Sequence, residues 1–413
     1  MGNNVIVIGA GAAGMMAAII AAENGASVTI LEKMPRVGKK LLITGKGRCN
    51  ITNIADIKEL IKNMHGNGSF LYSSFHNFSN NDLIDFFENL GVKTKVERGG
   101  RVFPESDKAI DVVDALLRKM DSLEIRILKD VAVKNIIKED NKVTAVVDKK
   151  GLVYQADKII VATGGASYPA TGSSGDGYVI AEKLGHTITP IKPSLVPLET
   201  EEDWVKIAQG LSLKNVKASI IVDDKKVAED FGEMLFTHYG VSGPIILSLS
   251  KIVAENLTEN KIVELAINLK PALSFEKLHN RVQRDFEKFS KKQIKNALNE
   301  LLPSKLIDII IDLSYINPDK MINQITKEER LRLVEQIMDL RLTITKTRPV
   351  AEAIVTAGGV SIKEINPKTM ESKIIEGLYF AGEIVDVDGY TGGYNLQAAF
   401  SMGYIAGKAV AMQ

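Results

Sequence analysis

The chain has 413 residues, of which 45% are hydrophobic and 25% charged, and its 52 basic and 51 acidic side chains leave a net charge of +1. This length exceeds the roughly 100 to 200 residues of a typical domain, and the composition is that of a globular α/β enzyme. The near-neutral balance argues against nucleic acid or an anionic membrane as partner, so a small-molecule substrate is expected, while the oligomeric state stays undetermined.

The cysteine and apolar patterns exclude further classes of protein. Cys49 is the single cysteine, which excludes an internal disulfide, a paired redox thiol and an all-cysteine metal site, and no metal is expected. The apolar run over residues 5–22 is long enough to resemble a membrane span, but it contains three glycines and changes from β-branched to alanine-rich residues. No targeting or lipidation signal precedes it, so cytoplasmic residence is expected.

The predicted elements begin with a buried parallel strand over Val5–Ile8, a turn over Gly9–Gly14, a helix over Met15–Asn24 and a strand over Ser27–Leu31. Farther along, helices are expected over Asn81–Leu90 and Asp107–Met120, and strands over Thr94–Glu97, Ile125–Ile137, Lys142–Asp148 and Tyr154–Ala162.

The second half of the chain changes in pattern and then returns to strands and helices. Prolines 190, 193 and 197 punctuate extended segments, which are followed by strand-like residues 218–222 and 262–269 and by helices from 275 to about 340. Strand-like segments return at 353–355 and 378–380, before a helix from about Asn395. The pattern predicts a nucleotide-binding domain of residues 1–190 and 345–413, interrupted by a β-rich domain, 191–270, and a helical domain, 271–344.

Three glycines after the first strand form a dinucleotide-binding motif. Gly9, Gly11 and Gly14 match GxGxxG: the first permits the turn, the second lets a pyrophosphate approach the backbone, and the third allows close helix packing. Helix N-terminal amides favour the phosphates. Glu32 follows Gly9 by 23 residues, a spacing typical of a carboxylate that accepts from ribose hydroxyls. These residues fit FAD and NAD equally.

A C-terminal segment distinguishes between the two cofactors. Residues 377–403, GLYFAGEIVDVDGYTGGYNLQAAFSMG, hold a strand, an acid at its carboxyl end, a Gly-rich turn and a helix start. At the switch point of an α/β sheet, Glu383 can accept from a ribityl hydroxyl, and residues 392–396 can direct helix amides at the N1 and O2 edge of a flavin. Such donors stabilise reduced flavin, so FAD is favoured over a glycine-rich surface loop.

Residues 44–53, TGKGRCNITN, and the segment GLYFAGEIVDVDGYTGGYNLQAA resemble the BaiN-like bacterial family of FAD-dependent oxidoreductases, which includes an aminoacetone oxidase and a 3-oxo-bile-acid enone reductase. The resemblance spans essentially the whole chain. It implies a Rossmann-like α/β domain of the two-dinucleotide-binding-domain flavoprotein type, a noncovalent FAD, and β-rich and helical insertions, but it does not fix the substrate.

By position, the resemblance implies a set of residues at the FAD: Ala12, Ala13, Glu32, Lys33, Lys40, Gly45, Arg48, Cys49, Asn50, Val131, Ala132, Ala162, Thr163, Gly164, Gly382, Glu383, Asn395 and Leu396. Val131 and Ala132 match a strand segment whose backbone reads the adenine edge. Gly47 and the turn residues Gly392, Gly393 and Tyr394 complete the expected cofactor site.

Few residues are candidates for acid–base chemistry. His238 and Tyr239 lie in the insertion, where a second domain would cap the flavin, and as a pair they can transfer a proton to substrate. Lys46 and Arg48, which alternate with Gly45 and Gly47, suit an anion or the electron-rich edge of the flavin. Tyr168 and Arg101 are weaker candidates for substrate contact. A structural role is expected for His186, and inert packing for the thiol of Cys49.

The expected function is NAD(P)H-linked reduction of an unsaturated carbonyl compound by an FAD enzyme. Because a second GxGxxG motif is absent from the sequence, NADH or NADPH would bind transiently, and the sequence does not choose between them. Three alternatives stay open: a flavin amine oxidase that uses oxygen, an FAD-dependent enzyme that modifies nucleic acid, and a non-catalytic flavin-binding protein.

Overall fold

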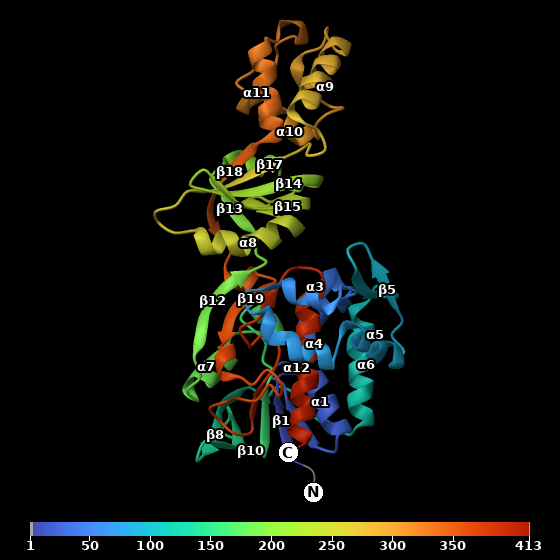
Figure 1. Ribbon diagram of the computed structural model, residues 1–413, viewed down its shortest axis with the longest axis vertical. Coiled ribbons are helices and arrows are strands. Elements are labelled where there is room, and N and C mark those ends of the chain that lie inside the picture. Colours follow the sequence, from blue (N-terminus) through green and yellow to red (C-terminus); the bar gives the residue numbers. More distant parts are fainter. Residues whose placement is uncertain (1–2, 413) are drawn as a thin grey trace. The chain divides into compact units, whose positions relative to one another are not determined.

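The computed structural model describes residues 3–412, and the chain forms two compact units (Figure 1). The discontinuous unit consists of Met1–Ser194 and Ala353–Gln413, and the inserted unit of Leu195–Glu352. Residues 1, 2 and 413, which belong to the predicted 1–190 and 345–413 domain, lie outside the described residues. Each unit has its own apolar core. The division of the insertion at residue 270 stays a prediction.

A parallel sheet lies at the centre of the discontinuous unit, in the strand order β20, β11, β1, β2, β7. These strands are β1 (Asn4–Ile8), β2 (Ser27–Leu31), β7 (Arg126–Leu128), β11 (Lys158–Val161) and β20 (Leu378–Phe380). Val7 of β1 pairs with Ile30 of β2 and Ile160 of β11. Helices cover such sheets on both faces, which is why the strands are runs of Val and Ile. The predicted Rossmann-like α/β class is confirmed.

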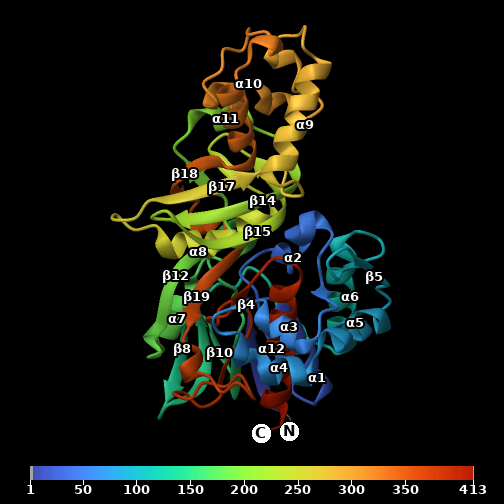
Figure 2. The ribbon, with the colours of Figure 1, turned by 45° about the horizontal axis from the view of Figure 1, so that its top comes forward.

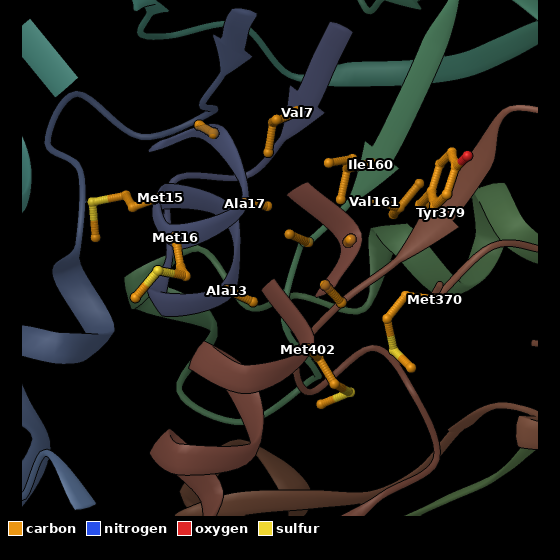
Figure 3. Close-up of a cluster of buried hydrophobic side chains, with 14 of the residues drawn as sticks. Val7, Ala13, Met15, Met16, Ala17, Ile160, Val161, Met370, Tyr379 and Met402 are labelled. Atoms are coloured by element: carbon orange, nitrogen blue, oxygen red, sulfur yellow. The ribbon is translucent and has the colours of Figure 1, made fainter. Parts of the chain in front are cut away.

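Two helices pack closely beside this sheet, α1 (Ala12–Glu23) and α12 (Tyr394–Ala411). Figure 3 shows Ala13 and Ala17 of α1 in one cluster with Met402 of α12. A Cβ atom built on Gly403 would lie 2.4 Å from the carbonyl oxygen of Ala13, and one on Gly407 equally close to that of Ala17. Glycine at these two positions lets the backbones of the helices approach each other.

Smaller sheets and helices complete the discontinuous unit. Its other strands, in the pairings β8-β9-β10, β3-β6-β5, β12-β19 and β4-β21, are β3 (Thr52–Asn53), β4 (Met64–His65), β5 (Thr94–Glu97), β6 (Arg101–Pro104), β8 (Val133–Glu139), β9 (Lys142–Asp148), β10 (Val153–Gln155), β12 (Ile188–Ser194), β19 (Val355–Val360) and β21 (Asp388–Gly389). Its other helices are α2 (Lys39–Ile43), α3 (Ile57–Lys62), α4 (Tyr72–Asn77), α5 (Asn80–Asn89), α6 (Ala109–Ser122) and α7 (Asp176–Lys183).

Several predicted boundaries are wrong. The first helix starts at Ala12 rather than Met15, because the glycine turn already contributes its first helical turn. The predicted strand over residues 154–162 is two strands, β10 and β11, which belong to different sheets. The strand predicted over 125–137 breaks between β7 and β8, so Val131 and Ala132 lie in a connection. The strand predicted at 353–355 is β19, which begins at Val355.

The inserted unit is an antiparallel barrel in the order β13-β16-β15-β14-β17-β18, closed by pairing of β13 with β18. Its strands are β13 (Leu198–Thr200), β14 (Ser212–Val222), β15 (Lys225–Phe236), β16 (Gly240–Ser242), β17 (Val263–Asn268) and β18 (Leu340–Thr347). Its helices are α8 (Pro244–Asn256), α9 (Phe275–Lys288), α10 (Ser304–Leu313) and α11 (Lys327–Met338). Figures 1 and 2 show α9, α10 and α11 together, and in sequence they separate β17 from β18.

No helix within residues 3–412 combines the length and apolar character needed to cross a bilayer. The apolar run over residues 5–22 is β1 and α1 of the sheet core.

Candidate functional site

The GxGxxG turn connects β1 to α1, and each of its glycines has a different environment. Gly9 has a φ of 101°, and a Cβ there would lie 2.6 Å from the carbonyl oxygen of Ala162. A Cβ on Gly14 would lie 2.0 Å from the carbonyl oxygen of Gly9. At Gly11, in contrast, no described atom lies within 4 Å of the Cβ position. Gly9 and Gly14 are therefore needed for close packing, while Gly11 keeps space open beside the backbone.

The N-terminus of α1 can bind an anion. Gly11 occupies the N-cap, no side chain caps the helix, and its first turn carries no acidic residue. The first amides of a helix lack intrahelical acceptors and lie at the positive end of its dipole. Ala12 and Ala13, which begin the helix, present no polar side chain to compete with a ligand. Open space at Gly11 and free helix amides fit the diphosphate of a dinucleotide.

Glu32 follows β2 and lies at the same edge of the sheet. Its carboxylate accepts from the backbone amides of Ala10, at 2.7 Å, and Met34, at 2.8 Å. The amide of Val131 donates to the carbonyl of Glu32 at 3.0 Å, so the connection that carries Val131 and Ala132 lies beside it. A carboxylate has about four acceptor positions, so Glu32 retains capacity for ribose hydroxyls.

Lys33 is directed elsewhere by an ion pair. Its ammonium lies 2.8 Å from Asp176 and 2.5 Å from the hydroxyl of Ser174. Asp176 begins α7, where a carboxylate also interacts favourably with the helix dipole. Lys33 thus connects the end of β2 to α7. It follows Glu32 in the sequence, but its ammonium group lies at Asp176.

A second charged pair joins α2 to the end of β20. Lys40 Nζ lies 2.6 Å from Glu383 Oε2 and 2.7 Å from Ser167 Oγ. The other carboxylate oxygen of Glu383 accepts from Ser167 Oγ at 3.0 Å and from the amide of Thr356 at 2.8 Å. Both oxygens of the Glu383 carboxylate therefore have partners, and about one of its four acceptor positions remains for a further donor. The preceding residue, Gly382, has a φ of 86° and packs against Ala13.

The electrostatics of this pair keep Glu383 ionised. Burial opposes ionisation of its carboxyl, but the charge and hydrogen bond of Lys40, with donation from Thr356 and Ser167, outweigh it and hold the pKa below its ordinary value. Burial, and then the nearby Glu383 carboxylate, raise the pKa of Tyr178, whose hydroxyl donates to the Glu383 carbonyl at 3.3 Å. An ionised acceptor at the end of a parallel strand suits a ribityl hydroxyl.

The loop of residues 44–50 holds unusual backbone and an unsatisfied polar atom. Lys46 and Cys49 have φ values of 60° and 61°, which cost a non-glycine residue about 1 kcal/mol or more. Asn50 Oδ1 is buried and has no hydrogen-bond partner among the described residues, and the same holds for Thr163 Oγ1. A buried acceptor without a donor is unfavourable, so a ligand that donates to Asn50 would stabilise the loop.

Arg48 lies within this loop, and its guanidinium forms ion pairs with two acidic side chains. It bonds Glu97 at 2.7 Å and Asp107 at 3.2 Å and lies 4.1 Å from the centroid of the Phe103 ring. Arg101, the weaker candidate, donates to the carbonyl of Arg98 at 3.0 Å. Arg48 therefore joins the loop to the β5–β6 hairpin, a contact that the sequence analysis did not anticipate.

Cys49 is fully buried, and desolvation raises the pKa of its thiol to about 12 despite a hydrogen bond with Thr44. A thiol of this kind is protonated near neutral pH.

The two segments that carry the family resemblance touch each other. Thr52 Oγ1 donates to Gln397 Oε1 at 2.6 Å, and Asn53 Nδ2 donates to the carbonyl of Gly392 at 3.0 Å. A Cβ on Gly393 would lie 2.3 Å from the carbonyl oxygen of Thr52. The structure thus brings residues 44–53 and the start of α12 into one site, although some 340 residues separate them in the sequence.

Asn395 holds the turn that precedes α12, and its place at the flavin stays a prediction. Its amide accepts from the backbone of Gly389 at 2.8 Å and donates back to the same residue at 2.8 Å, so it fixes the turn ahead of α12. The helix N-terminus itself has no side-chain cap and no acid in its first turn. Gly393, Tyr394 and Leu396 therefore surround amides that remain able to bind the edge of a flavin.

The catalytic candidates His238 and Tyr239 belong to the inserted unit, whereas Arg48 belongs to the discontinuous one. The rings of His238 and Tyr239 contact each other edge to face at 4.8 Å. The guanidinium of Arg348 lies 4.7 Å from the Tyr239 ring centroid and pairs with Glu199 at 2.6 Å. Burial raises the pKa of Tyr239, although the charge of Arg348 acts in the other direction.

The remaining candidates divide into one exposed and one buried residue. Tyr168, with a φ of 53°, precedes a short 3-10 turn and is exposed. His186 is buried, with Nδ1 3.2 Å from Glu364 and Nε2 3.0 Å from Ser372 Oγ. Since Ser372 Oγ also accepts from the amides of Ile374 and Ile375, this array is a satisfied internal network rather than an accessible catalytic triad.

Sequence reasoning missed the partners that hold the site together: Asn53, Ser167, Thr356 and Gln397. Ser167 lies one residue before the candidate Tyr168, and Thr356 lies in the glycine-bearing strand VTAGGV, which resembles the other glycine-rich strand ends of this unit. Such a pattern could have indicated Thr356. Asn53 and Gln397 lie within the two segments that carry the family resemblance, and that position is the only signal they have in the sequence.

Comparisons with known proteins agree on the class. A family model described as "HI0933-like protein Rossmann domain" matches residues 3–409. A 3-dehydro-bile acid delta(4,6)-reductase of Clostridium scindens is 34% identical over 99% of this chain and 99% of its own. A ribosomal RNA dihydrouridine synthase of Haemophilus influenzae is 34% identical over 99% of this chain and 98% of its own.

A solved structure supports the fold. The 3-ketosteroid-delta4-(5alpha)-dehydrogenase from Rhodococcus jostii matches with a TM-score of 0.56 at 15% identity, covering 100% of this chain and 97% of its own.

Proposed function

This chain belongs to the HI0933-like family and is a flavin-dependent oxidoreductase, and from that premise we propose that it uses FAD to reduce a carbon–carbon double bond conjugated to a carbonyl group. The observation that carries this proposal is the 34% identity over essentially the whole chain to two relatives with different names. Both names describe saturation of a C=C bond conjugated to a carbonyl, one in a keto-steroid ring and the other in uracil. The shared bond change, rather than either substrate, is the common element.

The reaction requires a hydride and a proton. With NAD(P)H as the donor, it consumes NAD(P)H, a proton and the unsaturated carbonyl compound, and yields NAD(P)⁺ and the saturated carbonyl compound. Conjugation matters because the carbonyl oxygen accepts the negative charge when hydride reaches the β-carbon, and the α-carbon then takes the proton. FAD supplies two-electron transfer when bound, and the protein supplies orientation, electrostatics and a proton.

The residues of the discontinuous unit fit FAD. Open space at Gly11 and the uncapped start of α1 would hold the diphosphate, and Glu32 the ribose. Glu383 would accept from the ribityl chain, and Asn50 would satisfy its buried Oδ1 with a donor of the flavin ring. This assignment of roles is our proposal. Its support is the open space at Gly11, the uncapped start of α1, the remaining acceptor capacity of Glu32 and Glu383, and the buried Asn50 Oδ1 that has no partner among the described residues.

The proton donor is assigned to the inserted unit. Tyr239, with His238 at its edge and Arg348 over its ring, is a phenol whose protonated form is stabilised by burial, as a general acid requires near neutral pH. Arg348 pairs with Glu352 and Glu199, which keep it a permanent cation, and from its position over the ring it can stabilise the phenolate left after proton transfer.

The test is an anaerobic titration of FAD-loaded protein. NADH or NADPH should bleach the flavin, and a 3-keto-4,6-diene steroid should then restore its colour while losing its own conjugated absorbance. Restoration by oxygen alone, after reduction by an amine, would instead indicate the amine-oxidase alternative. Absence of bleaching with both nicotinamides contradicts the NAD(P)H-linked reaction.

A second candidate substrate is uracil in ribosomal RNA. The observation that favours it is the relative from Haemophilus influenzae, whose identity of 34% equals that of the bile-acid reductase. Deletion of the gene in its host, followed by mass spectrometry of ribosomal RNA nucleosides, should remove a dihydrouridine. Unchanged dihydrouridine would leave a small enone as the substrate.

A further inference from the structure

One face of α9 in the inserted unit carries basic side chains at helical spacing. Lys277, Arg281, Arg284 and Lys288 stand at positions i, i+4, i+7 and i+11, which places them on the same side of a helix. The apolar residues Leu278, Val282 and Phe286 form a different face and are buried in the core of the unit. We call the first set, with Lys291 and Lys292 beyond the helix end, the basic face of α9.

The local charge differs strongly from that of the whole chain. Residues 277–295 contain seven Lys and Arg against two Asp and Glu, a net charge of +5 in a chain whose total is +1. The low net charge therefore does not argue against a polyanion, because it averages over a surface on which the charges are not evenly distributed.

Ion pairs within the unit neutralise only part of this charge. Lys288 pairs with Glu300 at 2.8 Å, and Arg281 lies 3.6 Å from Asp285. For Lys277, Arg284 and Lys291, the part of the chain that the structure describes provides no ion pair, and all three side chains are exposed. If these side chains served only to keep the helix solvated, positive and negative charges that alternate along the face would do so with less repulsion.

The arrangement carries a cost for the isolated helix. Lys277 and Arg281, and likewise Arg284 and Lys288, are like charges four residues apart, and Arg281 and Arg284 are three apart. Neighbours at these spacings repel each other. An external anion with several charges removes this repulsion, whereas small counterions do so weakly.

The geometry favours an extended polyanion. With a rise of 1.5 Å per residue, the four basic residues of the helix span roughly 16 Å, with about 5 Å between successive charges. A row of phosphates along one nucleic-acid strand can meet such a row of cations. A helix that binds the surface of a membrane instead presents bulky apolar residues beside its basic face, and those of α9 are buried within the unit.

We propose that the basic face of α9 is a surface that binds the phosphate backbone of RNA. This goes beyond the proposed function, and it does not depend on which unsaturated carbonyl compound the flavin reduces. Binding would act through phosphates, which position the RNA without reading its sequence.

The experiment uses full-length, FAD-loaded protein and a fluorescently labelled, unmodified ribosomal RNA transcript. A triple variant, Lys277→Gln, Arg284→Gln and Lys291→Gln, removes the three cations that have no ion pair. Its dissociation constant for RNA at low salt should rise by at least roughly tenfold, and the slope of log K against log salt should decrease by about 2, because each lost phosphate contact on a single strand contributes about 0.7.

A matched control removes equally exposed lysines elsewhere: Lys183→Gln, Lys214→Gln and Lys225→Gln, none of which has an ion pair with a described residue. This control should retain the affinity and salt slope of the wild type. Thermal unfolding of both triple variants establishes that they are folded, and substitution of exposed lysine or arginine should change it little.

Three results would overturn the RNA-binding proposal. They are RNA binding that the α9 variant and the control lose equally, wild-type protein that does not bind the transcript at low salt, and binding of phosphatidylserine vesicles in place of RNA. Reduction of a small enone by the same α9 variant reports separately on the proposed function. If that reduction fails in wild-type protein while RNA binding holds, only the proposed reaction is at fault.

Discussion

The guanidinium of Arg48 and the carboxylate of Glu97 form two hydrogen bonds, 2.7 and 3.3 Å long, that attach the loop of residues 44–50 to the β5–β6 hairpin. The hydrogen bond that Arg48 donates to Glu97, against the effect of desolvation, raises the pKa of Arg48, and the same bond lowers the pKa of Glu97. Both groups are therefore charged across the physiological range. This geometry favours a positioning role for Arg48 over direct catalysis.

Replacement of Arg48 should therefore weaken cofactor binding. Arg48→Lys keeps the charge but removes the two-pronged contact, so the loop that carries Asn50 loses its fixed position. The dissociation constant for FAD, measured by flavin fluorescence, should rise by at least about tenfold. Arg98→Lys serves as the control because its side chain is exposed and has no ion pair with a described residue. Normal FAD affinity with a lost kcat would instead assign Arg48 to the chemistry.

Gly11 and Gly14 should respond differently to alanine. Gly11→Ala adds a methyl group where no described atom lies within 4 Å, so the FAD-free protein should unfold at nearly the wild-type temperature while its FAD affinity falls. Gly14→Ala places a methyl group 2.0 Å from the Gly9 carbonyl and should cost about 1–3 kcal/mol of stability. Calorimetry with and without FAD separates the two effects. Equal destabilisation by both would contradict the assigned roles.

Lys40 should be needed most where Glu383 is ionised. The stability that Glu383 contributes through its lowered pKa is present above its unfolded pKa of about 4.3 and is lost as pH falls toward the folded pKa. Lys40→Met leaves the buried carboxylate without its counter-charge, at a cost of about 2–4 kcal/mol near pH 7. Urea unfolding at pH 7 and pH 5 should show a smaller cost at pH 5, where the variant can protonate Glu383. An equal cost at both pH values would argue that the ion pair is unimportant.

The network around His186 predicts a stability change at mildly acidic pH. Burial lowers the pKa of His186, although Glu364 acts in the other direction, so the unfolded chain binds a proton more readily than the folded one. Stability is then fully present above the unfolded pKa of about 6.5 and falls as pH decreases below it. His186→Asn should cost about 1–3 kcal/mol at pH 7.5 and flatten this dependence. His76→Asn, at an exposed position, should leave the dependence intact.

Cys49 should be unreactive in the folded protein. With its pKa raised to about 12 by burial, only about one thiol in 10⁴ is ionised at pH 8, and the side chain has no exposure. Alkylation followed by mass spectrometry should label Cys49 only after denaturation. Rapid labelling of native protein would show that the loop opens.

Elements that depend on local sequence were predicted closely, whereas elements that depend on contacts with distant residues were not. The strands of the parallel sheet and the glycines of the first turn follow from local pattern, and their positions agree with the structure to within a few residues. β15 was missed because its first nine residues contain no buried side chain, carry several Lys and Glu, and include Gly232, so it lacks a regular apolar alternation. The single strand predicted over residues 154–162 is wrong, because β10 pairs with β9 and β11 pairs with β1, and these partners lie elsewhere in the chain.

For the site, the predicted cofactor residues stay predictions, and the sequence did not indicate what their side chains contact within the chain. Asn395 bonds the backbone of Gly389, and Lys33 pairs with Asp176. Both are polar groups whose partners lie on other elements, so no spacing rule predicts them.

By itself, the sequence determined the Rossmann-like nucleotide fold, the family and the cofactor class, since these depend on periodicity, on glycines with defined backbone roles and on short rare motifs. Only the tertiary structure decided that Arg48 pairs with Glu97, that Lys40 pairs with Glu383 and that Lys277, Arg284 and Lys291 of the basic face have no ion pair with a described residue. The reason is physical: charges act over distances of a few ångströms in space, and the chain brings residues hundreds of positions apart within that range.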